Sequence, residues 1–200
     1  MKINIDRFIN STNSRASMPQ VNAAAINTKF QETVSNLKDK GLESRNDTIF
    51  NSMALYLAET ALGCRREGLL FSGGVGAGKT WAGKVIAGFR GLHFYSADEL
   101  LQDYMDDKAA FWEKTKKEET IVIDDLGIEV TMNDYGVRFE VMSQLLVARY
   151  RLYENHGTRT IITSNLTGKD MANRYGVRVY SRLKDMCKCV NVKGDDLRNN

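Results

Sequence analysis

The chain has 200 residues, of which 42% are hydrophobic and 26% are charged, and its net charge is +3. This length is sufficient for one domain with a buried core, and the composition is typical of a globular protein. No apolar stretch is long enough to cross a membrane and no basic-then-apolar leader opens the chain, so we expect a cytoplasmic protein without membrane contact. The net charge is too small to predict nucleic-acid binding by itself.

The N-terminal region is predicted to be separate from the main domain. Residues 1–20 are polar and rich in Asn and Ser, which is typical of a flexible arm. Helices are predicted over residues 21–40 and 46–62, with a break at Gly41. We therefore predict an arm and a helix, either packed on the domain or available to a partner, over residues 1–44. Residues 45–200 would form the main domain.

A phosphate-binding loop is the most specific motif of the sequence. The segment GGVGAGKT matches G-x-x-x-x-G-K-[ST], follows the apolar run Leu69–Phe71, and precedes a stretch with helical character. Backbone N–H groups of such a loop surround an anion at a helix N-terminus. Lys79 would contact the β- and γ-phosphates of ATP, and the Thr80 hydroxyl would bind Mg²⁺. The predicted nucleotide-binding residues are Gly73, Gly74, Val75, Gly76, Ala77, Gly78, Lys79, Thr80 and Trp81. A glycine-rich turn that binds nothing is the alternative, but it does not require Lys-Thr in this register.

Two carboxylates follow the next strongly apolar segment. The β-branched run Ile121–Ile123 predicts a strand buried on both faces of a parallel sheet. Ligands of such sheets bind at the carboxyl ends of the strands. Asp124 would hold Mg²⁺ through its water shell, and Asp125 would orient or deprotonate the attacking water. Alone, this pattern would be an acidic turn; together with the phosphate loop it forms a Walker B motif.

Asn165 is the third predicted site residue. It follows the segment Thr160–Ser164, which is predicted to be another strand. An amide at the tip of a neighbouring strand would hydrogen-bond the γ-phosphate or the attacking water. Asparagine after a strand is otherwise a common turn residue, so the prediction depends on the other two motifs.

The elements between these motifs predict a three-layer α/β fold. A strand is expected at residues 92–95, and the capping box Ser96–Glu99 would open a helix. Apolar residues spaced by three or four positions predict one long helix that ends at Gly157; they are Phe139, Met142, Leu146, Tyr150 and Tyr153. Alternating strands and helices indicate a parallel sheet with right-handed crossovers. In the version of this fold with an inserted strand, the strand that ends near Asn165 lies between the other two motif strands.

The cysteines and the basic residues of the C-terminal quarter permit several interpretations. Cys64, Cys187 and Cys189 are predicted to be reduced thiols, and the Cys187-x-Cys189 pair could also be redox-active. The basic cluster is either a solvated surface or a contact for phosphates of DNA or of a neighbour's nucleotide. It consists of Arg174, Arg178, Arg182, Lys184, Lys188, Lys193 and Arg198.

Several segments together resemble the ATPase domain of DnaC/DnaI-type replicative helicase loaders. They are TIVIDDLGIE (120–129), Ala148–Tyr150, TIITSNL (160–166), VRVYSRLKDM (177–186) and Gly194–Arg198. The related IstB-like transposition helper ATPases share much of this pattern. The resemblance covers roughly residues 45–198 and implies a P-loop NTPase domain of the AAA+ (ASCE) class, whose site is completed by the next subunit of an oligomer.

The resemblance also implies a function and partners. It implies an ATPase that couples its nucleotide state to a ring helicase and single-stranded DNA. The alternatives are a transposition helper ATPase or a nucleotide-gated DNA-binding adaptor. A small-molecule P-loop kinase is disfavoured by the Asp124-Asp125 pair and Asn165.

Arg182 occupies the position of the arginine finger in this resemblance. A guanidinium from the adjacent subunit would neutralise charge on the γ-phosphoryl oxygens. The alternatives are an ordinary helix-surface arginine or an ion pair with Asp185, and Arg178 is the second candidate. Few residues follow Arg182, so little or no C-terminal lid is expected. Asp125 stands where vigorous AAA+ ATPases have glutamate, which predicts slow hydrolysis.

Overall fold

The computed structural model describes residues 21–44, 46–129 and 137–192. The chain divides into two compact units, residues 1–43 with 50–65, and residues 44–49 with 66–200. The predicted arm and the predicted contacts of residues 193–198 lie outside the described residues. No helix of the described part is long and apolar enough to span a membrane.

The first unit contains two helices, α2 (Ala23–Asp39) and most of α3 (Asp47–Ala61). Asn22 caps α2 by accepting a hydrogen bond from the Ala25 N–H at 2.8 Å. The buried residues of α2 recur every three or four positions, as expected for one apolar face; they are Ile26, Phe30, Thr33 and Leu37. Both predicted helices are confirmed, with ends shifted by one or two residues. The partner-binding role of residues 1–44 stays a prediction.

The second unit is built on a sheet of five parallel strands. The strands are β1 (Gly68–Gly73), β2 (His93–Ser96), β3 (Thr120–Asp124), β4 (Arg159–Ser164) and β5 (Cys187–Val192). Their order is β2-β3-β4-β1-β5, and every neighbouring pair is parallel. The strand that leads to Asn165 therefore lies between the strand of the phosphate loop and the strand of Asp124, as predicted.

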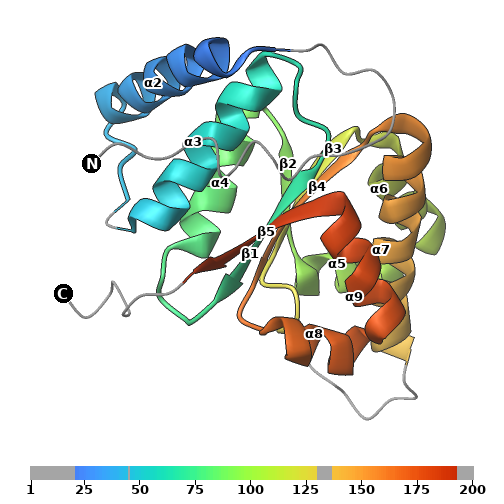
Figure 1. The fold of residues 1–200 in the computed structure, drawn as a ribbon. Coiled ribbons are helices and arrows are strands. Elements are labelled where there is room, and N and C mark those ends of the chain that lie inside the picture. The colour runs from blue at the N-terminus through green and yellow to red at the C-terminus, as the bar shows by residue number, and fades with distance from the viewer. Residues whose placement is uncertain (1–20, 45, 130–136, 193–200) are drawn as a thin grey trace. The chain divides into compact units, whose positions relative to one another are not determined.

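Helices cover both faces of this sheet (Figure 1). One face carries α4 (Lys79–Arg90). The other carries α5 (Ala97–Asp106), α6 (Lys108–Lys117), α7 (Val137–His156), α8 (Gly168–Tyr175) and α9 (Val177–Met186). Side chains alternate accordingly: Val122 faces Gly83 of α4, whereas Ile121 and Ile123 join the core under α5, α7 and α9. The predicted three-layer architecture is confirmed. Within the described residues, no helical lid follows α9.

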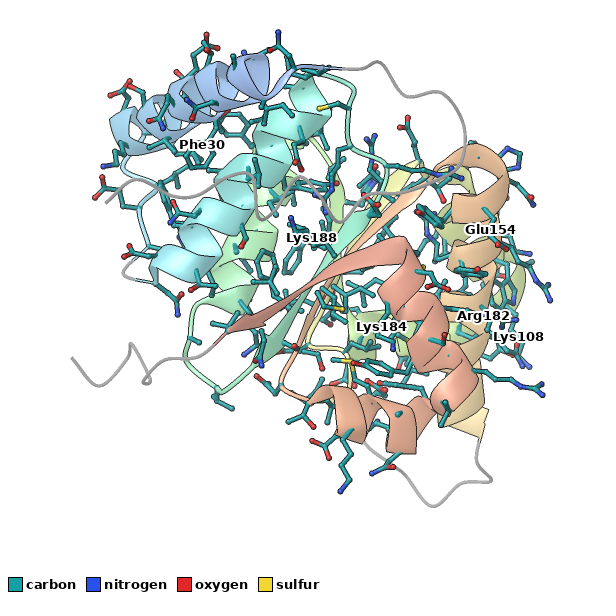
Figure 2. All side chains as sticks on the ribbon, viewed as in Figure 1. Phe30, Lys108, Glu154, Arg182, Lys184 and Lys188 are labelled. Atoms are coloured by element: carbon teal, nitrogen blue, oxygen red, sulfur yellow. The ribbon has the colours of Figure 1, made fainter. Side chains whose placement is uncertain are left out.

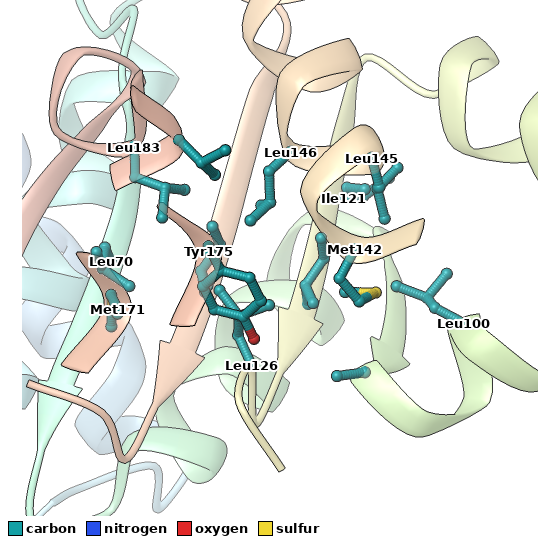
Figure 3. Packing of buried hydrophobic residues seen from close by; sticks show 14 of the residues in the cluster. Leu70, Leu100, Ile121, Leu126, Met142, Leu145, Leu146, Met171, Tyr175 and Leu183 are labelled. Atoms are coloured by element: carbon teal, nitrogen blue, oxygen red, sulfur yellow. The ribbon is translucent and has the colours of Figure 1, made fainter. Parts of the chain in front are cut away.

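A hydrophobic cluster of buried residues lies between the sheet and α5–α9 (Figure 3). The labelled members are Leu70, Leu100, Ile121, Leu126, Met142, Leu145, Leu146, Met171, Tyr175 and Leu183. Each fully buried side chain of this size contributes about 1.5–3 kcal/mol through removal of apolar surface from water. Met142 and Leu146 are buried here as the helical spacing predicted, and Tyr150 and Tyr153 pack against the cluster half-buried. The Phe139 side chain lies outside the described residues.

The sequence predictions omitted several elements, including α6, α8 and β5. Helix α6 begins at an Asp107 cap that accepts hydrogen bonds from Ala109 and Ala110, but only Phe111 and Thr115 of this helix are buried. With two buried positions and four lysines, the helix shows no clear apolar periodicity in the sequence. Strand β5 was missed because its buried and exposed positions do not alternate regularly. It carries Cys187 and Cys189, which form no disulfide among the described residues.

Candidate nucleotide-binding site

Three strand tips meet at the carboxyl edge of the sheet. The register pairs Ser72 of β1 with Ser164 of β4, and Ile123 of β3 with Ile162 of β4. Because the strands are parallel neighbours, the loops that follow them leave the sheet at the same edge. The phosphate loop, the Asp124-Asp125 pair and Asn165 therefore gather around one region, as predicted.

The backbone of the predicted phosphate loop requires glycine at its first and its last glycine position. Gly73 has φ 138°, and a Cβ there would lie 2.1 Å from the carbonyl oxygen of Val192 in β5. Gly78 has φ 91° and begins α4 in the left-handed conformation. The first turn of a helix leaves N–H groups without intrahelical acceptors, which gives this loop the chemistry of an anion site.

Lys79 is held inside the loop by backbone oxygens. Its side chain is buried, and Nζ donates hydrogen bonds to the carbonyls of Gly73 at 3.0 Å and Gly74 at 2.5 Å. Burial lowers the pKa of Lys79, while Asp125 and Asp124 oppose that shift. A buried ammonium with only carbonyl partners is incompletely neutralised, so an anion at the loop would gain a strong electrostatic interaction.

Asp124 and Asp125 are tied to strand β4 by one hydroxyl. Thr163 Oγ1 donates to Asp124 Oδ1 and accepts the Asp125 N–H at 2.9 Å. Asp124 is buried at the end of β3, whereas Asp125 is half-buried. Thr163 was not predicted as a site residue; its signal in the sequence is a hydroxyl two positions before Asn165 on a buried strand.

Asp125 has an unusual backbone conformation and environment. Its φ is 53°, the single positive value among the described non-glycine residues, which costs of order 1 kcal/mol or more. Asn165 Nδ2 donates to Asp125 Oδ1 at 3.4 Å, so the structure brings these two predicted residues together. Burial raises the pKa of Asp125, the neighbouring Asp124 raises it further, and Lys79 acts in the opposite direction.

The residues fit a magnesium ion that is shared with a nucleotide. Thr80 is the second residue of α4, and Asp124 and Asp125 offer carboxylate oxygens at the adjacent strand tip. The described residues contain no group of three or more carboxylate, imidazole or thiol side chains suited to a metal. Magnesium needs no such cage, because it usually keeps several waters and binds one or two carboxylates together with phosphates.

The remaining predicted residues of the loop region differ in exposure. Val75 is exposed, Ala77 is buried, and Trp81 is half-buried in the first turn of α4. Gly74 and Gly76 occupy the turn between the strand and the helix.

Arg182 does not join this site within its own chain. Its guanidinium lies 5.5 Å from the ring centre of Tyr150 on α7, and Figure 2 shows it on α9. Helix α9 leads into Cys187, which pairs with Gly68 at the amino end of β1, so the helix ends at the opposite edge of the sheet. The assignment of Arg182 to a neighbouring subunit's site stays a prediction.

Known structures share this fold. The DnaC helicase loader is 25% identical, with a TM-score of 0.58 over 76% of this chain and 93% of that one. DnaI is 20% identical, with a TM-score of 0.61 over 82% of this chain and 94% of that one. The replication initiator DnaA bound to AMPPCP and single-stranded DNA is 19% identical, with a TM-score of 0.56 over 82% of this chain and 50% of that one.

These similarities decide the fold class. The chain has an AAA+ P-loop fold. The resemblance to DnaC/DnaI-type loaders is confirmed at the level of structure. No family model matches the sequence. No curated protein matches it either.

Proposed function

We propose that the protein binds ATP and hydrolyses it slowly as a replicative helicase loader. The observation that carries this proposal is the convergence of Lys79, Asp124, Asp125 and Asn165 at one edge of an AAA+ sheet. The structural similarity to the DnaC and DnaI loaders supports the replication-related part.

In the proposed site the residues divide between binding the phosphates, holding magnesium and acting on the attacking water. The loop of residues 73–80 surrounds the phosphates, and Lys79 leaves its carbonyl partners to contact the β- and γ-phosphates. Thr80 and Asp124 hold magnesium, which neutralises phosphate charge when bound. Asp125 accepts a proton from the attacking water, and Asn165 positions that water or senses the γ-phosphate.

Asp125 makes the proposed hydrolysis slow. Its carboxylate is one methylene shorter than that of glutamate, and it is already engaged by Asn165. Slow hydrolysis suits a switch in which the ATP-bound state persists long enough to act on a partner.

The proposed partners are a ring helicase, single-stranded DNA and further copies of the chain. One structural relative is described as a helicase loader, and another is bound to single-stranded DNA. Arg182 would enter the site of the adjacent protomer, so that turnover depends on assembly. The segment 1–44 is the proposed contact for the helicase.

Hydrolysis measured against protein concentration and single-stranded DNA tests this function. We expect little ATP hydrolysis by dilute protein, and a rise when the protein is concentrated or oligo(dT) is added. Dilute protein that transfers the γ-phosphate to a nucleoside monophosphate would contradict the loader function and indicate a kinase.

Subunit mixing tests the shared site. Arg182→Ala and Lys79→Ala proteins should each be inactive, and a mixture should recover part of the activity because one interface then contains both intact halves. Absence of recovery at every ratio would contradict the role of Arg182 in the neighbouring site.

A further inference from the structure

A buried carboxylate that the proposed chemistry does not use lies a few residues beyond Asp125. Glu129 has only 2% of its surface exposed. An unpaired carboxylate at such a position would be strongly unfavourable, so its partners carry information about its role. It lies on the loop that follows β3, four residues after Asp125.

Glu129 ties this loop to itself and to helix α8. Oε2 accepts the Gly127 N–H at 2.8 Å, and Oε1 accepts a hydrogen bond from the Tyr175 hydroxyl. Arg174 donates from Nη2 to the Glu129 carbonyl oxygen at 2.5 Å, and its Nε lies 3.5 Å from Oε1. Tyr175 is itself 5% exposed and belongs to the core, so the anchor is rigid.

The other end of the same loop is fixed by β4. The Leu126 N–H donates to the Thr163 carbonyl at 2.8 Å, and Ser164 Oγ donates to the Leu126 carbonyl at 2.5 Å. The Asp125 N–H is held by Thr163 of β4. Its carbonyl accepts the Ile128 N–H at 3.0 Å, so the Asp125 backbone is fixed both by β4 and by the segment that Glu129 holds. Its positive φ is a conformation that the chain keeps only when its surroundings enforce it.

We propose that Glu129 is a positioning residue that holds Asp125 in its productive conformation through the Gly127 N–H and Tyr175. The inference rests on the proposed ATPase function. Loss of the anchor leaves the phosphate loop and Lys79 intact, because those lie on β1 and α4. It releases the Asp125 backbone, so hydrolysis falls while ATP affinity is kept.

The chain offers matched variants for this test. Glu129→Ala removes both hydrogen bonds, and Glu129→Gln keeps an acceptor for Gly127 and a donor for the Tyr175 oxygen. Tyr175→Phe removes the hydrogen bond to Glu129 Oε1 and keeps the one from Gly127 to Oε2. Tyr95→Phe is the control, because Tyr95 also donates to a glutamate, Glu118, at 2.7 Å but on the edge strand β2.

Single-turnover hydrolysis and ATP affinity are measured for each folded variant. We expect Glu129→Ala to slow hydrolysis about 30-fold, within the range that a displacement of about 1 Å produces, with the Kd for ATP changed less than about twofold. Glu129→Gln should recover most of the rate, Tyr175→Phe should lose about fivefold, and Tyr95→Phe should match the wild type.

Amide hydrogen exchange gives a second readout that is independent of turnover. Glu129→Ala and Tyr175→Phe should speed exchange at Gly127 and Asp125, and Tyr95→Phe should not. Normal hydrolysis by Glu129→Ala with an active wild type would overturn this inference alone. An equal rate loss in Tyr95→Phe would also overturn it, because the effect would then be general. A wild type that bound no ATP would overturn both the inference and the proposed function.

Discussion

The two edges of the central sheet use polar side chains for opposite purposes. At the amino edge, the buried Arg149 guanidinium donates to the carbonyls of Thr115, Glu118, Glu119 and Arg159 and to the hydroxyl of Thr160. Its donors are saturated by its own chain. At the carboxyl edge, Lys79 has two carbonyl partners, and Asp125 is held in a strained conformation beside it. At the amino edge, folding alone satisfies the buried charge of Arg149. At the carboxyl edge, the charge of Lys79 is left for a ligand to neutralise.

Arg149→Met gives the largest expected effect and acts on the amino edge. Burial lowers the pKa of Arg149 to about 10, opposed by Glu118, yet the residue remains charged at neutral pH. Its loss leaves several buried carbonyls without a donor, so the free energy of unfolding should fall by about 3–5 kcal/mol. Urea denaturation measures this. The Kd for ATP of the folded fraction should be unchanged, and a selective loss of ATP binding would contradict the division between the edges.

Lys79→Ala gives the converse result at the carboxyl edge. Removal of the ammonium should weaken ATP binding by about 100-fold or more, because a desolvated charge-assisted contact to phosphate is lost. Stability should change little, since burial already disfavours the charged lysine, as its lowered pKa indicates. Calorimetric titration and urea denaturation of the same preparation separate the two effects. If Lys79→Ala unfolded as easily as Arg149→Met, Lys79 would be a residue that stabilises the fold, and this would contradict its role in ligand binding.

Two threonines on β4 sharpen the comparison. Thr160→Val removes the acceptor of Arg149 Nε at the amino edge, and Thr163→Val removes the hydroxyl shared by Asp124 and Asp125. Each should cost about 1 kcal/mol of stability. Only Thr163→Val should slow hydrolysis, by about tenfold, since a catalytic carboxylate loses its orientation. Equal rates of ATP hydrolysis in the two variants would contradict a role of Thr163 in the site.

Asp125→Asn tests the smallest effect, a pH-dependent gain in stability. The folded-state pKa of Asp125 is raised by burial and by Asp124, so its ionised form opposes folding. The stability contribution of the protonated form is full below the unfolded pKa and is lost as pH rises through the folded pKa. The neutral amide should therefore stabilise the protein at pH 8, by less than about 1 kcal/mol because solvent screens this half-buried group.

The gain should disappear at a pH below the unfolded pKa, near 4. Urea midpoints of wild type and Asp125→Asn at both pH values measure the difference. If the gain in stability were the same at both pH values, its cause would be relief of the strained backbone and not the ionisation of Asp125, since asparagine also tolerates positive φ.

The sequence predicted the carboxyl edge better than the rest of the molecule. The phosphate loop, the Asp124-Asp125 pair and Asn165 each indicate a specific chemistry from local sequence. Because each follows a parallel strand, the topology brings them to the same edge of the sheet. The position of β4 between β1 and β3 was predicted from the version of the fold that has an inserted strand, and the structure confirms it. Strand β5 and helix α6 were missed because lysines and asparagine interrupt their apolar periods.

Contacts between distant residues explain the remaining omissions. Arg149 was noted only as part of a resemblance, and its saturation by carbonyls from α6, the connection between α6 and β3, and β4 depends on tertiary packing. The shared hydroxyl of Thr163, the positive φ of Asp125 and the burial of Glu129 are also set by neighbours far along the chain. No local pattern in the sequence encodes them.

Equilibrium binding of ATP to wild type and Lys79→Ala, with and without Mg²⁺, tests the central claim most directly. The account predicts that wild type binds ATP, that Mg²⁺ tightens binding, and that Lys79→Ala loses it while remaining folded. Equal binding by both proteins, or no binding by the folded wild type, would contradict a nucleotide site at the carboxyl edge of the sheet.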